Sequence, residues 1–319
     1  MFKVFVLVRN LESSARRLDF SDFTISVVGL RFEELRDAFS STDVNRDDWI
    51  FEKLYAAPPP GPPGSPVGGI PKDIEDLLLL FRLYKSGDIS FVKQAIIPPG
   101  GNKVIQFPYR AMNDLNSYSS LRFRLGSEEC ESWTTFANGL RSSRSWNSQW
   151  FSVTRRFFLY GGAKEFSPKW DDIDRIVDYA TALEAAVVPE SEFSGRRFRH
   201  RAAMLASPDD LEEQKAVRKF MQQLYDVRSS IVHGSKLSNE KRDWLIENCA
   251  EIEVWIRQVL TAAVLKIPAE EIERRTMLAE LYDPADEDRG ESALQKFREI
   301  RTDTVRKSIA ERIGRLRDS

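Results

Sequence analysis

The pattern of apolar residues changes once along the chain, near residue 127, and this change limits the possible folds. Before it, short runs rich in β-branched and aromatic residues alternate with turns. After it, apolar residues recur three and four positions apart almost without a break. The sequence therefore predicts an α+β fold: an N-terminal mixed α/β domain, residues 1–126, then an all-α helical bundle, residues 127–268, and C-terminal helices, residues 269–319.

These patterns also predict the individual elements. The expected strands are residues 2–8, 23–30, 49–55, 89–97, 103–109 and 121–125. A single amphipathic helix is expected among them, at residues 73–84. The later helices are expected at residues 128–140, 147–160, 171–188, 209–231, 239–266, 269–281 and 292–316. Residues 57–71 hold so many prolines and glycines that we expect an exposed loop there, with a polyproline docking segment as the alternative.

Composition predicts an ordinary globular protein. Hydrophobic residues make up 42% of the chain and charged residues 30%, which excludes a disordered or fibrous chain. Cys130 and Cys249 match no zinc or redox spacing, so we expect no metal and no cofactor. No apolar run has the length of a membrane span or the features of a signal peptide. We therefore expect a soluble, cytoplasmic protein.

Charge favours local rather than general binding of nucleic acid. The formal net charge is −2, which argues against sequence-blind coating of a polyanion. One segment is locally basic, because Arg196, Arg197, Arg199 and Arg201 fall within six positions together with a histidine and an aromatic residue. Such a composition suits phosphate groups and makes these arginines candidate RNA contacts, whereas the alternative is the solvated start of a helix.

The helix expected at residues 209–231 has a clear start and an apolar seam. Ser207 is predicted as the N-cap, with Pro208 at the first helical position and Asp210 completing a capping box. Downstream, apolar residues follow at alternating spacings of three and four, at positions 217, 220, 224, 227 and 231. Arg228 comes directly after position 227 of this seam, so it is placed near the end of the helix.

Arg228 and His233 are the candidate catalytic residues. On an uninterrupted helix, five residues turn the chain through roughly 500°, which leaves these two side chains about 140° apart. Gly234 is suited to the left-handed position that ends a helix, so His233 is predicted at the C-cap. There the imidazole could turn toward the last helical turn or toward a second subunit.

Three segments resemble a known superfamily. Residues 224–234, residues 173–189 and residues 201–205 are similar to the HEPN superfamily, in particular to its ApeA-like branch, whose motif is an arginine followed after four to six residues by a histidine. The resemblance covers about residues 145–265. Arg228 and His233 match the motif, whereas Ser229 stands where many members have Asn, Asp or His.

The resemblance implies a dimeric helical bundle in which two such motifs meet, and in many members a metal-independent endoribonuclease. Prokaryotic members commonly act as stress or antiviral defence effectors. The chemistry agrees with the residue types, because RNA cleavage needs a base, an acid and a cation on the phosphate. His233 can serve as acid or base, and Arg228 can stabilise the phosphoryl charge. In a two-fold dimer, two histidines could divide the acid and base roles.

Three further residues are assigned supporting roles. Glu184 shares a helical stripe with apolar residues, so its carboxylate is predicted to pair with Arg228, the alternative being an exposed boundary glutamate. Ser229 is a supporting polar residue, and Lys236 is a candidate RNA contact beyond the helix end. The alternative to the nuclease function is a nuclease-dead RNA-binding or protein-interaction module.

Overall fold

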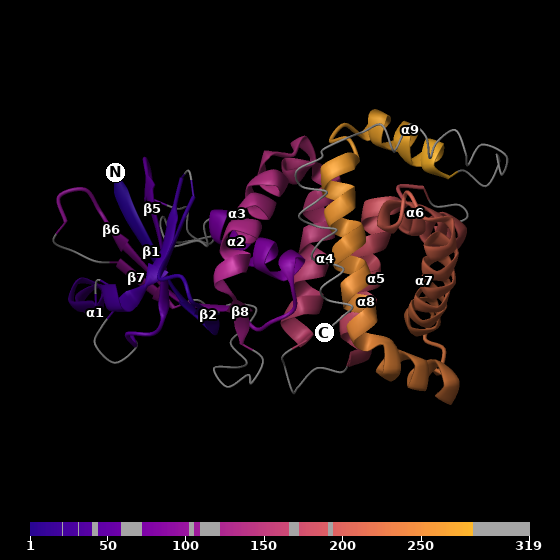
Figure 1. The fold of residues 1–319 in the computed structure, drawn as a ribbon, viewed down its shortest axis with the longest axis horizontal. Coiled ribbons are helices and arrows are strands. Elements are labelled where there is room, and N and C mark those ends of the chain that lie inside the picture. Colours follow the sequence, from indigo (N-terminus) through magenta and orange to yellow (C-terminus); the bar gives the residue numbers. More distant parts are fainter. Residues whose placement is uncertain are drawn as a thin grey trace. The chain divides into compact units, whose positions relative to one another are not determined.

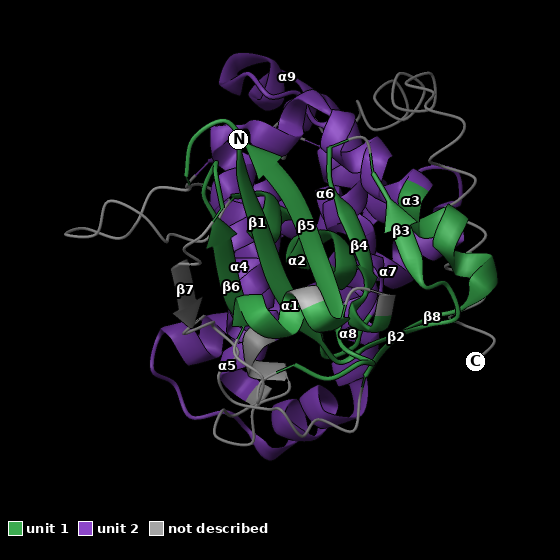
Figure 2. Ribbon diagram, turned by 90° about the vertical axis from the view of Figure 1, so that its left-hand side faces the viewer, with its two compact units in different colours: residues 1–82, 86–134 green, residues 83–85, 135–319 purple. Residues whose placement is uncertain are grey.

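The structure, a computed structural model, consists of two compact units (Figure 2). Unit 1 contains residues 1–82 and 86–134, and unit 2 contains residues 83–85 and 135–319. The residues that the structure describes are 1–20, 22–30, 32–39, 44–58, 72–101, 105–108, 122–165, 172–190 and 194–282. The predicted α+β fold class, with a sheet followed by a helical part, is confirmed. No helix of the described residues is long and apolar enough to cross a membrane.

Unit 1 is built on an antiparallel sheet with the strand order β3-β4-β5-β1-β6-β7 (Figure 1). Its strands are β1 (Phe2–Arg9), β3 (Arg17–Asp19), β4 (Thr24–Val27), β5 (Trp49–Tyr55), β6 (Ser90–Ile97) and β7 (Ile105–Pro108). A separate parallel pair is formed by β2 (Leu11–Ser13) and β8 (Phe123–Leu125).

The central strand β1 is buried on both faces. Residues 4–8 have no exposed surface, and because side chains alternate along a strand, they face both sides of the sheet. On one side, Phe5 and Leu7 pack with residues of α1 (Phe32–Phe39) in a hydrophobic cluster. Helix α2 (Lys72–Tyr84) lies on the other side (Figure 2). This double coverage explains why β1 is a continuous apolar run.

Each predicted strand overlaps an observed strand. The run 23–30 forms β4 and then a single 3-10 turn, Val28–Leu30. The sequence missed β2, β3 and α1, because strands of three residues and a helix of eight give little periodic signal. Most of the expected loop 57–71 and the whole expected helix 292–316 lie outside the described residues.

Helix α3 (Ser127–Ser142) begins in unit 1 and ends in unit 2. Its residue Trp133 is fully buried and stacks on Phe81 of α2, with ring centroids 4.3 Å apart. Because this indole belongs to the core of unit 1, that unit includes the start of α3, up to residue 134. The sequence analysis had divided the chain before this helix, after residue 126.

Unit 2 is a helical bundle (Figure 1). Its helices are η2 (Arg144–Asn147), α4 (Gln149–Glu165), α5 (Asp172–Val187), α6 (Ser194–Ala206), α7 (Leu211–Val232), α8 (Asn239–Lys266) and α9 (Glu271–Leu281). The sequence predicted a helix at α6 only as the alternative explanation of its basic run. Helix α9, expected in a separate C-terminal region, belongs to the bundle, since Leu278 and Leu281 are buried.

Candidate functional site

Helix α7 carries the candidate site, and its start differs from the prediction. Asp210 is the N-cap, and its carboxylate accepts hydrogen bonds from the backbone N–H groups of Glu212 and Glu213, each at 2.9 Å. The predicted N-cap, Ser207, instead donates its hydroxyl to the side chain of Glu213. The carboxylate of Asp210, rather than the hydroxyl of Ser207, caps the first free N–H groups of the helix. The helix therefore begins three residues later than the predicted N-cap implied.

The end of α7 follows the prediction. The helix ends at Val232, His233 is the C-cap, and Gly234 has a left-handed φ of 69°. The N–H of Gly234 donates to the carbonyl of Ile231 at 2.9 Å, and the N–H of Ser235 donates to that of Ser230 at 2.8 Å. These two bonds form a Schellman motif, which only a residue tolerant of positive φ can close without strain.

The predicted ion pair between Glu184 and Arg228 is confirmed. Nη2 of Arg228 lies 2.6 Å from Oε2 of Glu184, and the two side chains are 19% and 20% exposed. The guanidinium also lies over the ring of Tyr225, with its Cζ 6.0 Å from the ring centroid. Within the described residues, only Nη2 has a hydrogen-bonding partner. Arg228 is therefore fixed in place, yet retains donors at a position that solvent can reach.

Tyr225 is a site residue that the sequence did not single out. Its hydroxyl shares a hydrogen bond of 2.8 Å with the hydroxyl of Ser194 at the start of α6. A Cβ on Gly195 would lie 2.7 Å from the Tyr225 ring, so only glycine allows this close approach. The sequence did contain a signal for a role of Tyr225 beside Arg228, because it precedes Arg228 by three residues and therefore shares its side of the helix.

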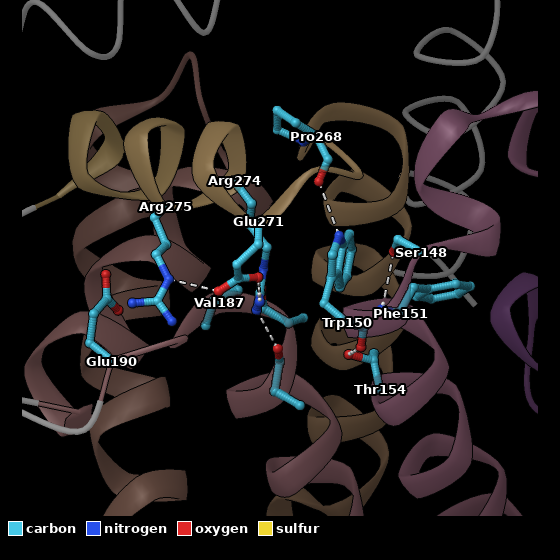
Figure 3. A network of polar contacts seen from close by, with 12 residues as sticks. Ser148, Trp150, Phe151, Thr154, Val187, Glu190, Pro268, Glu271, Arg274 and Arg275 are labelled. Atoms are coloured by element: carbon cyan, nitrogen blue, oxygen red, sulfur yellow. Dashed lines mark hydrogen bonds and ion pairs between the residues drawn. The ribbon is translucent and has the colours of Figure 1, made fainter.

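Two buried arginines hold the end of α5, just beyond Glu184. Nη1 of Arg201 donates to the carbonyl of Val187 at 2.9 Å. Nη2 of Arg274, which lies near Glu271 in Figure 3, donates to the carbonyl of Ala185 at 2.6 Å. The last carbonyls of a helix lack partners within the helix and carry partial negative charge. The two guanidinium groups satisfy them, which fixes the turn that presents Glu184.

The RNA-contact role predicted for Arg201 is wrong, because its side chain is fully buried. Its guanidinium donates to both carboxylate oxygens of Glu190, at 2.8 and 3.1 Å, and to the carbonyl of Tyr282 at 3.1 Å. Burial opposes ionisation of Glu190, but the hydrogen bonds and charge of Arg201 hold the pKa of that carboxyl below its ordinary value. Arg201 is therefore a structural residue.

The other predicted RNA contacts remain at or near the surface. Arg196 and Lys236 are exposed, Arg197 and Ser229 are half-buried, and so is Arg199, which donates to the side-chain carbonyl of Gln222. Solvent can therefore reach these side chains, as contact with RNA would require. The hydrogen bond of Arg199 links α6 to α7.

His233 is exposed, and its imidazole makes no hydrogen bond with Arg228 or Glu184. The φ of −85° and ψ of 8° at His233 stay close to helical values, so its Cβ still follows the rotation of α7. The chain leaves the helical path only at Gly234. One chain therefore brings Glu184 and Arg228 together, but leaves His233 about 140° away around the helix axis.

A cavity of about 670 Å³ opens elsewhere in unit 2, between the starts of α4 and α9. Trp150, Glu271 and Arg274 are among the residues that line it (Figure 3). It contains none of the predicted site residues. Within the described residues, no group of three or more His, Cys, Asp or Glu side chains could hold a metal ion.

Comparison of the chain with protein-family models, with curated proteins and with solved structures found no match, so the residues and geometry above carry the functional argument.

Proposed function

We propose that this protein is a metal-independent endoribonuclease of the HEPN type, which cleaves RNA by attack of a 2′-hydroxyl on the neighbouring phosphate. The observation that carries the proposal is the Arg228–Glu184 ion pair, at 2.6 Å, on the last turns of a helix that ends at His233 and Gly234. The reaction requires a fixed cation for the phosphate and an imidazole for the proton transfers, and the last turns of α7 carry both side chains.

Arg228 supplies the charge for the phosphoryl group. Glu184 engages Nη2, which orients the planar guanidinium. Nε is buried, so Nη1 is the nitrogen that would donate to the non-bridging oxygens. Because those oxygens gain negative charge as the fifth bond to phosphorus forms, an oriented cation stabilises the transition state more than the ground state. Ser229, half-buried on the next position, supports the same end of the helix.

His233 moves the protons. A neutral imidazole takes the proton of the 2′-hydroxyl, whose oxygen attacks phosphorus. An imidazolium gives a proton to the departing 5′-oxygen, so the products are a 2′,3′-cyclic phosphate and a 5′-hydroxyl. Because Arg228 and His233 of one chain lie about 140° apart on α7, the proposal includes a homodimer in which a second copy completes each site.

The direct test is incubation of the full chain with RNA in EDTA, followed by mapping of the new ends. We expect the wild type to leave 2′,3′-cyclic phosphate and 5′-hydroxyl ends, and His233→Ala to leave none. Arg242→Ala serves as a control, because it removes an exposed side chain of α8 that has no role in the proposed site. Equal cleavage by wild type and His233→Ala would refute the role of His233.

A second candidate function is an RNA-binding or protein-interaction module without cleavage. The observation that favours it is the separation of His233 from Arg228 within one chain. Such a module would bind RNA equally well before and after the His233→Ala exchange and would produce no new ends. For the nuclease, we propose a cytoplasmic setting and a role in stress or antiviral defence, as in the family that the chain resembles.

A further inference from the structure

Helices α6 and α7 pack side by side (Figure 1). They carry arginines that are exposed or half-buried. The two helices run antiparallel there, because Ser194 at the start of α6 bonds Tyr225 late in α7, and Arg199 bonds Gln222 one turn earlier in α7. Arg218 lies one further turn back along α7. We call Arg196, Arg199 and Arg218 the α6–α7 cationic cluster.

His200 reports on the charge of this cluster. Its imidazole stacks on the ring of Tyr282, with centroids 3.9 Å apart and planes 13° from parallel. Burial is the largest cause that lowers its pKa, to about 4, and the charges of Arg218, Arg199 and Arg196 lower it further. The three guanidinium groups, which come from two helices, are therefore each close enough to His200 for their charges to act on its imidazole.

Two members of the cluster, Arg199 and Arg218, differ from three other arginines of unit 2 in their ion pairing. Arg201, Arg228 and Arg274 each pair with a glutamate. Arg199 and Arg218, by contrast, form no ion pair within the described residues. Like charges that converge oppose folding, and an anion that neutralises them gains binding free energy.

We propose that the α6–α7 cationic cluster is a phosphate subsite that holds a single-stranded RNA while its scissile bond lies at Arg228 and His233. This inference rests on the proposed nuclease function and deepens it, because it assigns the path of the substrate. Arg218 and Val232 lie about 21 Å apart along the axis of α7, a length suited to a strand of at least about four nucleotides. Arg218, which the sequence analysis did not single out, becomes a binding residue.

The first test measures RNA binding against salt concentration. A labelled single-stranded RNA of roughly a dozen nucleotides is titrated with the full chain, and the slope of log affinity against log salt is compared between variants. We expect Arg218→Ala to reduce the slope by about 0.7, the loss of one phosphate contact. Lys219→Ala removes the same charge from the next, exposed position and should leave the slope unchanged.

A second readout follows the imidazole of His200 by NMR in the His233→Gln protein. The chain has two histidines, so this variant leaves a single imidazole signal, and it should not cleave the RNA during titration. RNA phosphates beside the cluster should raise the pKa of His200 above about 4. Inorganic phosphate at the same ionic strength should shift it less, and an equal shift would mean a site for free phosphate and overturn the assignment to RNA.

The two proposals fail in distinguishable ways. RNA cleavage by the wild type, combined with an unchanged salt slope for Arg218→Ala, overturns the subsite and leaves the nuclease intact. A reduced slope for Arg218→Ala without any cleavage by the wild type supports the subsite and refutes the nuclease. A reduction of the slope by Lys219→Ala as large as that by Arg218→Ala overturns the subsite, because it indicates general electrostatic attraction.

Discussion

Two arginine–glutamate pairs near the end of α5 have the same chemistry but different exposure. Arg201 is fully buried and donates to Glu190 and to the backbone carbonyls of Val187 and Tyr282. Arg228 is 19% exposed and is held by Glu184 through one nitrogen. A guanidinium can act on a phosphate only where the phosphate can reach it. Arg201 is therefore a structural residue, whereas Arg228 has the exposure that the proposed function requires.

The largest expected effect is on the buried pair. Arg201→Ala leaves Glu190 and the carbonyl of Val187 without their donors, which should lower the free energy of unfolding by about 3 kcal/mol in urea denaturation. Arg196→Ala, an exposed arginine on the same helix, is the matched control and should change it by less than about 0.5 kcal/mol. Equal stability of the two variants would remove the distinction between buried and exposed arginines.

The next effect concerns the exposed pair. Glu184→Gln keeps the size of the side chain but removes the charge that orients Arg228, so we expect RNA cleavage to fall about tenfold, or about 1.4 kcal/mol in transition-state stabilisation. The free energy of unfolding should change by less than about 1 kcal/mol, since the pair is partly exposed. Glu247→Gln, at an exposed position of α8, is the control. Undiminished cleavage by Glu184→Gln would contradict the orienting role.

A smaller effect should follow from the packing beneath Arg228. Gly195→Ala places a methyl group 2.7 Å from the ring of Tyr225, so the ring must move, and we expect a net loss of about 1 kcal/mol in stability. Gly126→Ala is the control, because its Cβ would meet only a side-chain oxygen at an ordinary 3.6 Å. If Gly195→Ala melts at the wild-type temperature, the close approach of α6 to Tyr225 is not a constraint.

The smallest effect is on the pH dependence of stability. The pKa of Glu190 is lower in the folded protein than its ordinary value of 4.5, so the folded state favours the charged form. This stabilisation is present above pH 4.5 and is lost as the pH falls through the lowered pKa. We expect the wild type to lose stability more steeply in that window than Glu190→Gln. Parallel acid unfolding curves for the two proteins would disprove the linkage.

The sequence predicted those parts of the fold that local patterns encode. Strand β1 and helix α2 have unmistakable periods, and both were found within one residue of their observed bounds. Helix α6 has four arginines among residues 196–201 and a run of apolar residues only after them, so the charges concealed the helix. The division inside α3 depends on the stacking of Trp133 on Phe81, a contact between residues distant in sequence.

The candidate site was predicted where spacing alone determines it. The C-cap at His233 follows from Gly234, and the pairing of Glu184 with Arg228 follows from a carboxylate on an apolar stripe that needs a partner. The spacing of the arginines did not show that Arg201 is fully buried whereas Arg199 is half-buried. That difference depends on which side of α6 packs against the rest of the bundle. Nor could spacing place Arg218 beside His200, since that depends on how α6 packs on α7.

The most direct measurement compares RNA cleavage and the free energy of unfolding in Arg228→Ala. We expect cleavage in EDTA to fall at least about a hundredfold, as for loss of one transition-state donor, while the free energy of unfolding changes by less than about 1 kcal/mol. Cleavage at the wild-type rate, or a loss of stability as large as that of Arg201→Ala, would contradict the assignment of Arg228 as the functional arginine.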